Sequence, residues 1–245
     1  MTRLLIACGV VLAACSPLAP RPDRTRFFVL APISPDPGTV ERLRPDAVIG
    51  LGPMTFPSYL RRTALVTRVG PNRVTFSDDA RWAEPVETSF QRVLALNLAT
   101  LLGTDRIVGY PWVRPPAPDY AIAVDVSRFE RTTDGGGELA ARVTIHDRAG
   151  KVLERRDVRL VEHAPGGGEE DTVAALSTAL AGLSREIAGS TQRLDGDRHA
   201  VGRRTRTSGR SAPIIRGACG PSRRCATRRT AALLPGRWAS GPLFA

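Results

Sequence analysis

The sequence predicts one α+β domain, a mostly antiparallel sheet with two main helices packed on it. Two stretches repeat their apolar residues at helical spacing, and short runs rich in β-branched and aromatic residues alternate with turn signals elsewhere. Three of these runs follow one another through turns of hairpin composition. The chain has 245 residues, of which 42% are hydrophobic, and this suffices for a sizeable core.

Four strands are expected before the first helix. Each is a short apolar or β-branched run, and the turn between the last two, 70–72, reads Gly-Pro-Asn. The expected strands cover residues 26–30, 47–51, 64–69 and 73–77.

The first helix is expected over residues 86–102. Pro85 suits its first turn and Gly103 suits its end. Its apolar face collects Val86, Phe90, Val93, Leu94, Leu98 and Leu101. Asn97 interrupts that face, and we interpret it as a buried amide that bonds a loop backbone; the alternative is a ligand-binding group.

The second half of the sequence predicts a strand at 107–110, a three-strand meander and a final helix. The meander strands alternate apolar with smaller or polar residues over 119–130, 138–147 and 152–161. The final helix is expected to begin at an N-cap, Asp171, and to carry one apolar stripe. This stripe consists of Val173, Leu176, Leu180, Leu183 and Ile187.

The N-terminus predicts a lipoprotein signal peptide over residues 1–14. Its apolar run is too short to span a bilayer and ends in Leu-Ala-Ala-Cys, which resembles the bacterial lipobox. Cys15 would then receive diacylglycerol and an N-acyl chain, and Ser16 after it predicts sorting to the outer membrane. A rival box ends at Cys8 but leaves only four apolar residues before the cysteine. The alternative is an ordinary cleaved signal with an incidental cysteine.

Three segments are expected after the signal peptide. Residues 15–26 contain three prolines and predict an extended tether that holds the domain off the membrane. Residues 27–190 form the expected α+β domain. Residues 191–245 predict a disordered arginine-rich tail, because the helical periodicity stops near Leu194.

The formal charge of +11 is concentrated in that tail. From Arg193 onward there are 12 arginines and two aspartates, whereas residues 16–192 hold 22 basic and 22 acidic side chains. The domain is therefore neutral and nucleic acid is not an expected partner. Lys151 is the only lysine, against 34 arginines, and this ratio indicates a GC-rich coding sequence. A frameshift in such a sequence would give an arginine-rich end, which is one interpretation of the tail. The other is a basic arm that binds anionic lipid headgroups, lipopolysaccharide or cell wall.

The sequence lacks the motifs of an enzyme or a metal site. The three histidines, His146, His163 and His199, do not pair with one another or with a nucleophile. The glycines 166–168 precede a helix but are followed by three acidic residues that would repel phosphate. The pair Cys219 and Cys225 has no second pair to complete a zinc site. We expect no enzyme and no cofactor beyond the acyl chains.

Several segments resemble the PqiC-type auxiliary lipoproteins of bacterial ABC-like, MCE-domain transport systems. They cover most of residues 15–190 in the family's order, and Arg-Trp-Ala-Glu-Pro at 81–85 is the most specific. The others are Phe-Phe-Val-Leu-Ala-Pro at 27–32, Ile-Gly-Leu-Gly-Pro at 49–53, Pro-Ser-Tyr-Leu-Arg-Arg at 57–62, Val-Thr-Arg-Val-Gly-Pro-Asn-Arg at 66–73, Asn-Leu-Ala at 97–99 and Leu-Ser-Arg-Glu-Ile at 183–187.

The resemblance implies a lipid-anchored protein on the outer membrane that faces the periplasm. It also implies an MCE-domain partner that forms a lipid tunnel between the membranes, with this protein docking the tunnel and supporting membrane integrity. The resemblance leaves open whether the protein forms a homo-oligomer. The alternatives are a stand-alone periplasmic lipid carrier, which needs an apolar cavity, and an envelope hydrolase, which the missing catalytic residues disfavour.

A docking surface is expected to display aromatic residues and arginine, which dominate interface energies. The candidates are Tyr59, Arg61, Arg62, Arg81 and Trp82, because they gather near one turn and at a helix entry. The alternative is that Trp82 fills the core and Arg81 pairs with a neighbouring glutamate.

Overall fold

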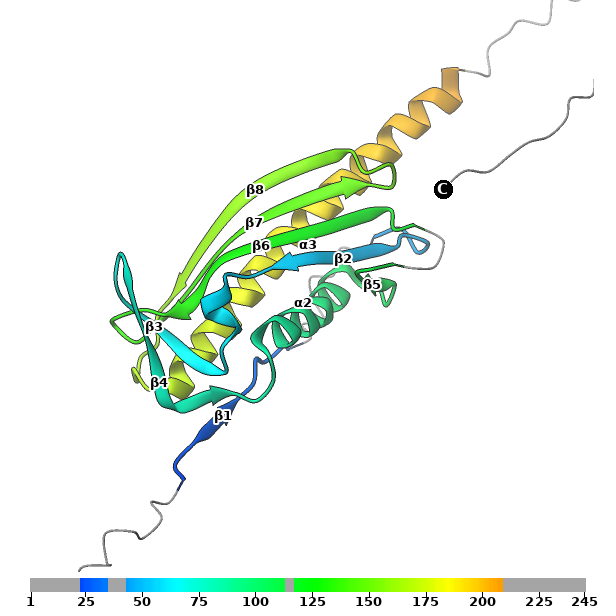
Figure 1. Ribbon diagram of the computed structural model, residues 1–245. Coiled ribbons are helices and arrows are strands. Elements are labelled where there is room, and N and C mark those ends of the chain that lie inside the picture. The colour runs from blue at the N-terminus through cyan, green and yellow to red at the C-terminus, as the bar shows by residue number, and fades with distance from the viewer. Residues whose placement is uncertain (1–22, 35–42, 113–116, 209–245) are drawn as a thin grey trace, which may run out of the picture. The chain divides into compact units, whose positions relative to one another are not determined.

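The computed structural model describes residues 23–34, 43–112 and 117–208 (Figure 1). The signal peptide, Cys15, Ser16, most of the tether and residues 209–245 lie outside the described residues. The described residues up to Arg204 group into one compact unit, and of the second unit only 205–208, the end of a helix, are described.

The described chain forms an α+β domain, as predicted. Its strands are β1 (Arg26–Phe28), β2 (Ile49–Thr55), β3 (Ala64–Gly70), β4 (Arg73–Trp82), β5 (Ile107–Gly109), β6 (Tyr120–Arg131), β7 (Gly137–Asp147) and β8 (Val152–Glu162). The helices are η2 (Ser58–Arg61), a single 3-10 turn, α2 (Val86–Leu102) and α3 (Glu169–Ser208).

The eight strands form one mixed sheet. The long meander β6–β7–β8 and the hairpin β3–β4 are antiparallel, as expected. Four shorter pairings, β1–β4, β2–β5, β2–β6 and β3–β6, are parallel. They arise because the chain returns through long connections before it enters these strands, and parallel pairing needs such crossovers. β2 and β3 share one side of β6, since β2 pairs along 120–125 and β3 pairs at Arg131.

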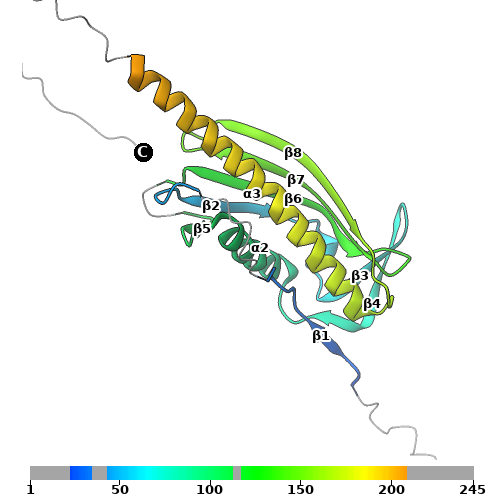
Figure 2. The same ribbon diagram turned by 180° about the vertical axis from the view of Figure 1, so that it is seen from behind.

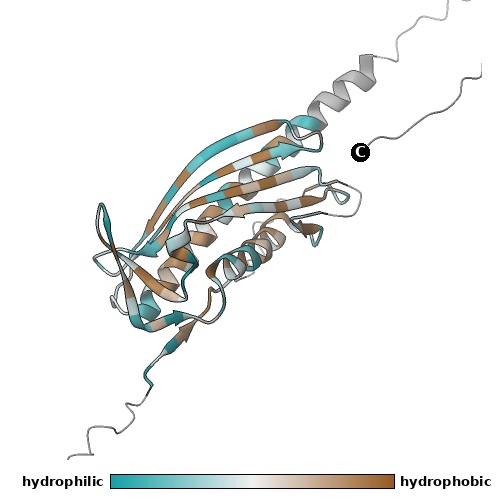
Figure 3. Cartoon of the chain, viewed as in Figure 1, coloured by the Kyte–Doolittle hydropathy of each residue, from teal (hydrophilic) through white to brown (hydrophobic). Residues whose placement is uncertain are grey.

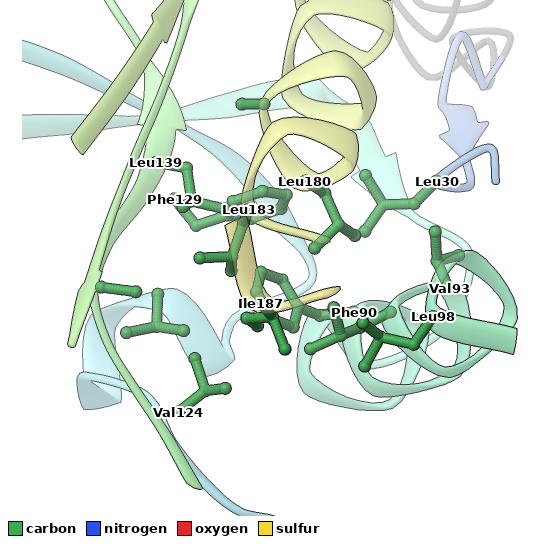
Figure 4. Close-up of a cluster of buried hydrophobic side chains, with 14 of the residues drawn as sticks. Leu30, Phe90, Val93, Leu98, Val124, Phe129, Leu139, Leu180, Leu183 and Ile187 are labelled. Carbon is green, nitrogen blue, oxygen red and sulfur yellow. The ribbon is translucent and has the colours of Figure 1, made fainter. Parts of the chain in front are cut away.

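The hydrophobic core lies between the sheet and its two helices. α3 runs along the face of β6, β7 and β8, and hydrophobic and hydrophilic residues alternate along these strands (Figures 2 and 3). Apolar side chains from both helices and from the sheet meet in one cluster (Figure 4). Phe90 of α2 contacts Phe129 of β6 edge to face, with ring centroids 5.4 Å apart. The opposite face of the long strands carries the polar residues.

The first helix matches its prediction. α2 begins after Pro85 and ends at Gly103, whose φ of 60° suits glycine and whose N–H donates to the Ala99 carbonyl. Asn97 is buried and confirms its interpretation as a structural amide. Its Oδ1 accepts the Ile33 N–H at 2.9 Å, and its Nδ2 donates to Ser184 Oγ of α3 at 3.0 Å.

The last helix is longer than predicted at both ends. It begins at Glu169 rather than after Asp171, whose carboxylate accepts the Gly168 N–H from inside the first turn. It continues through Ser208, which corrects the expected start of a disordered tail at residue 191. Contacts hold the helix to the domain as far as Arg198: the buried Asp195 accepts the Tyr120 hydroxyl, and the Arg198 guanidinium lies 4.7 Å from the Tyr120 ring centroid.

Candidate partner-binding surface

Three of the predicted docking residues are exposed and lie on neighbouring segments. Arg61 ends η2 and pairs with Glu87 at 2.9 Å, and the Arg62 guanidinium lies 4.7 Å from the ring centroid of Phe76. Arg81 of β4 stands opposite Ala64 of β3, two residues after Arg62. The pairing of β3 with β4 therefore places Arg81 on a strand next to the segment that carries the exposed Arg61 and Arg62.

Trp82 does not belong to this surface, which corrects its prediction. Its side chain is 5% exposed and stacks on Phe129 with a centroid separation of 6.1 Å. Successive residues of a strand face opposite sides, so Arg81 points outward where Trp82 points into the core. Glu84 pairs with Arg92 at 2.5 Å rather than with Arg81.

Tyr59 is part of a buried polar network rather than a free aromatic side chain. Its hydroxyl donates to Glu130 Oε2 at 3.0 Å, and Glu130 is fully buried and paired with Arg68. The pKa of Tyr59 is raised, mainly because its hydroxyl is partly buried and secondly because the negative Glu130 carboxylate lies beside it. Removing Tyr59 would disturb this network, so it is a poor probe of partner binding.

Glu130 faces a second buried carboxylate across the sheet. Glu138 of β7 is directly opposite it, and two guanidinium groups neutralise Glu138: Arg128 at 3.0 Å and Arg159 at 2.9 Å. With Arg68 on Glu130, three arginines therefore balance two carboxylates at this end of the sheet. Like charges placed opposite one another destabilise a sheet unless they are paired in this way.

Phe27 joins the arginines and was not selected from the sequence. It lies in β1 directly opposite Arg81 of β4, and its side chain is 66% exposed, whereas Phe28 beside it packs against the core. Successive strand residues face opposite sides, but a strand of three residues is too short for the sequence to show which of the two rings faces outward. We call the surface formed by Phe27, Arg61, Arg62 and Arg81 the arginine patch.

The arginine patch is joined directly to the tether. β1 is a three-residue strand at the edge of the sheet, and the tether of 15–26 leads into it. Arg26 fixes this strand by pairing with Asp79 at 3.4 Å and with Glu169 of α3 at 3.1 Å. The patch therefore lies where the predicted tether would enter the domain.

The described residues contain no cluster of three or more His, Cys, Asp or Glu side chains that could hold a metal ion. The glycine loop 166–168 before α3 packs closely against Gly135. Gly135 and Gly167 both have positive φ, and their close approach leaves no room for a side chain at 135, where a Cβ would lie 2.8 Å from Gly167 Cα. None of the helices in the described segments is both long and apolar enough to span a membrane.

A family model described as "ABC-type transport auxiliary lipoprotein component" matches residues 28–188. The chain belongs to the ABC-type transport auxiliary lipoprotein family. The match begins within β1 and ends within α3, so it includes the sheet and both helices. This confirms the resemblance that the sequence motifs indicated and gives the chain a role as an auxiliary lipoprotein in transport.

Solved structures show the same fold in other proteins. A crystal structure of protein XCC0632 from Xanthomonas campestris, from the DUF330 family, matches with a TM-score of 0.59 and 15% sequence identity. The match covers 71% of the present chain and 99% of XCC0632. A crystal structure of an uncharacterized protein gives a TM-score of 0.55 and 18% identity, over 68% and 98% of the two chains. No curated protein matches the sequence.

Proposed function

We propose that this auxiliary lipoprotein is held on the outer membrane by acyl chains on Cys15, faces the periplasm and docks an MCE-domain partner. The partner would carry lipid between the two membranes, and the docked complex would support membrane integrity. The family supports the coarser role in transport, and the specific partner and membrane are our proposal. Each buried methylene contributes about 0.8 kcal/mol, so the two or three chains on one cysteine would anchor the protein stably.

The arginine patch carries this proposal. It combines an exposed phenylalanine with three exposed arginines, and these residue types are enriched where protein interfaces derive their binding energy. Its position at the root of the tether would present it to a partner that reaches the anchoring membrane. The proposed role requires binding and no chemistry, so we propose no enzymatic activity.

The packing between sheet and helix favours docking over the stand-alone lipid carrier. The hollow between β7, β8 and α3 measures about 10 Å³, and its lining includes Val143, Val158 and Ile187. That is about the room that one water molecule needs. An acyl chain would have to force these elements apart to enter there.

Charge reversal on the patch tests the docking role. Arg62→Glu and Arg81→Glu should each reduce recovery of the MCE-domain protein in affinity purification from envelopes, because each removes an interface cation and adds a repulsive charge. Arg185→Glu, at an exposed position on α3, is the matched control and should capture normally. Equal capture by all three variants would remove the arginine patch from the proposal.

A further inference from the structure

An aromatic cluster lies at the end of the sheet where β2 and β6 begin. Tyr110 follows β5 and is 52% exposed. Trp112 contacts it edge to face, with ring centroids 5.2 Å apart. The Tyr110 N–H donates to the Leu51 carbonyl at 3.0 Å, which extends the pairing of β5 with β2. Neither aromatic residue contributes to the arginine patch.

Two glycines of β2 lie directly beneath this cluster. A Cβ on Gly50 would lie 2.6 Å from Pro118 Cγ and 2.9 Å from the Trp112 ring. A Cβ on Gly52, whose φ is 121°, would lie 2.6 Å from Tyr110 Cβ. Larger residues at positions 50 and 52 would displace the rings. The two glycines therefore leave room for both aromatic side chains on the face of the sheet that the helices do not cover.

The cluster borders a hollow of about 230 Å³, which we call the aromatic hollow. Its lining is largely apolar on one side, with polar residues of β7 and the following turn on the other. The lining includes Pro53, Trp112, Pro118, Ala121, His146 and Arg148. Open hollows lined by aromatic residues are the sites where extended proline-containing peptides dock, because such peptides lose little conformational freedom on binding.

The charges at the rim favour an acidic ligand. Asp147 is already engaged, since its Oδ1 accepts the N–H groups of Ala149 and Lys151, both at 2.9 Å, and its other oxygen pairs with Arg198 at 3.8 Å. Arg148 is held at 2.9 Å by Asp119 but its side chain stays 57% exposed, and Lys151 is exposed beside it. Two cations therefore face solvent where the one nearby carboxylate of the turn is engaged.

The aromatic hollow lies far from the root of the tether. Trp82, which pairs with Phe28 of β1, stacks on Phe129, whereas the hollow adjoins the first residues of β6. Tyr120 and Phe129 are nine residues apart in one strand, or about 30 Å at 3.3 Å per residue. The hollow therefore lies at the end of the domain far from β1.

We propose that the aromatic hollow binds an extended, proline-containing segment of the transport partner, with a carboxylate of that segment against Arg148 and Lys151. The inference rests on the proposed function and adds a second contact to it, at the end of the domain opposite the arginine patch. Trp112 supplies aromatic contact area inside the hollow, with Tyr110 packed against it, and the rim cations select an acidic segment.

Photocrosslinking in native envelopes tests this assignment. The full-length protein with Tyr110→p-benzoylphenylalanine should crosslink to a partner peptide that contains proline and an acidic residue. Lys151→Glu in the same protein should reduce that crosslink about tenfold, the effect of losing one charge-assisted hydrogen bond. The probe at Leu96, an exposed residue of α2, is the background control, and the probe at Arg62 reports on the arginine patch.

Other outcomes overturn the assignment and are distinguishable from failure of the docking role. Crosslinks from position 110 to a second copy of this chain, to its own tether or to lipid alone would overturn it. So would a partner peptide without proline or an acidic residue, or an unchanged yield with Lys151→Glu. A partner crosslink from position 62 alone would leave the docking role standing, whereas no partner crosslink from either position would contradict both proposals.

Discussion

Asp195→Ala tests whether α3 belongs to the domain beyond residue 190. The Asp195 carboxylate is buried, accepts the Tyr120 hydroxyl at 3.0 Å and pairs with Arg44 at 3.1 Å. Arg44 also pairs with Asp119 at 2.8 Å, so one carboxylate holds the helix and the other holds the start of β6. Removal of Asp195 breaks the link between these elements.

The expected loss follows from the groups left behind. The buried Tyr120 hydroxyl loses its acceptor, which costs about 1–3 kcal/mol. Breaking a buried ion pair costs about 3–5 kcal/mol, but Arg44 keeps Asp119, so only part of that applies. We expect the free energy of unfolding to fall by about 3 kcal/mol. With a urea dependence of about 1–3 kcal/mol per M, the midpoint should move down by about 1–3 M.

Urea unfolding of the non-acylated Cys15→Ala protein, followed by tryptophan fluorescence, measures this shift. Asp197→Ala is the matched control, because it removes an exposed carboxylate two residues further along the same helix. We expect the control to change the free energy of unfolding by less than about 0.5 kcal/mol. Equal midpoints for the two variants would refute the claim that α3 is fastened at Asp195.

Three further predictions concern Trp82, Tyr120 and the end of α3. Trp82→Ala should lower the free energy of unfolding by about 3–5 kcal/mol in urea titration, and a loss under 1 kcal/mol would contradict its place in the core. Burial and Asp195 raise the pKa of Tyr120 to about 12. The folded state therefore favours the protonated phenol, and stability should fall as the pH rises from about 10 to 12; Tyr120→Phe should lack this component, and identical alkaline profiles would disprove it. Intact mass of the native protein should place the end of the chain beyond Arg198, and a chain ending near 190 would show that the helix extension is not made.

Local patterns in the sequence predict much of the fold. The meander and α2 follow from their periodicity, and Asn97 follows as a polar residue on an apolar face. The parallel pairings of β2 do not follow, because they depend on which distant segments meet rather than on local periodicity. The end of α3 was missed for a related reason. The apolar stripe stops before Asp195, and the helix continues because of polar contacts to residues far away in the sequence.

The candidate surface could be predicted only in part. Arginine at 61, 62 and 81 is recognisable as exposed, and the structure places all three at the surface. Trp82 cannot be assigned from its type, because a tryptophan at a helix entry can fill either an interface or a core. Phe27 was overlooked because a three-residue strand is too short for its alternation to indicate which ring faces outward.

Docking of an MCE-domain partner at the outer membrane is the role that we propose for this lipoprotein. Crosslinked affinity purification of the Cys15-acylated protein from detergent-solubilised envelopes, with mass spectrometry of proteins and lipids, tests it most directly. We expect recovery of a large MCE-domain protein, reduced by Arg62→Glu. Recovery of the lipoprotein alone with stoichiometric phospholipid would contradict docking and would favour the carrier.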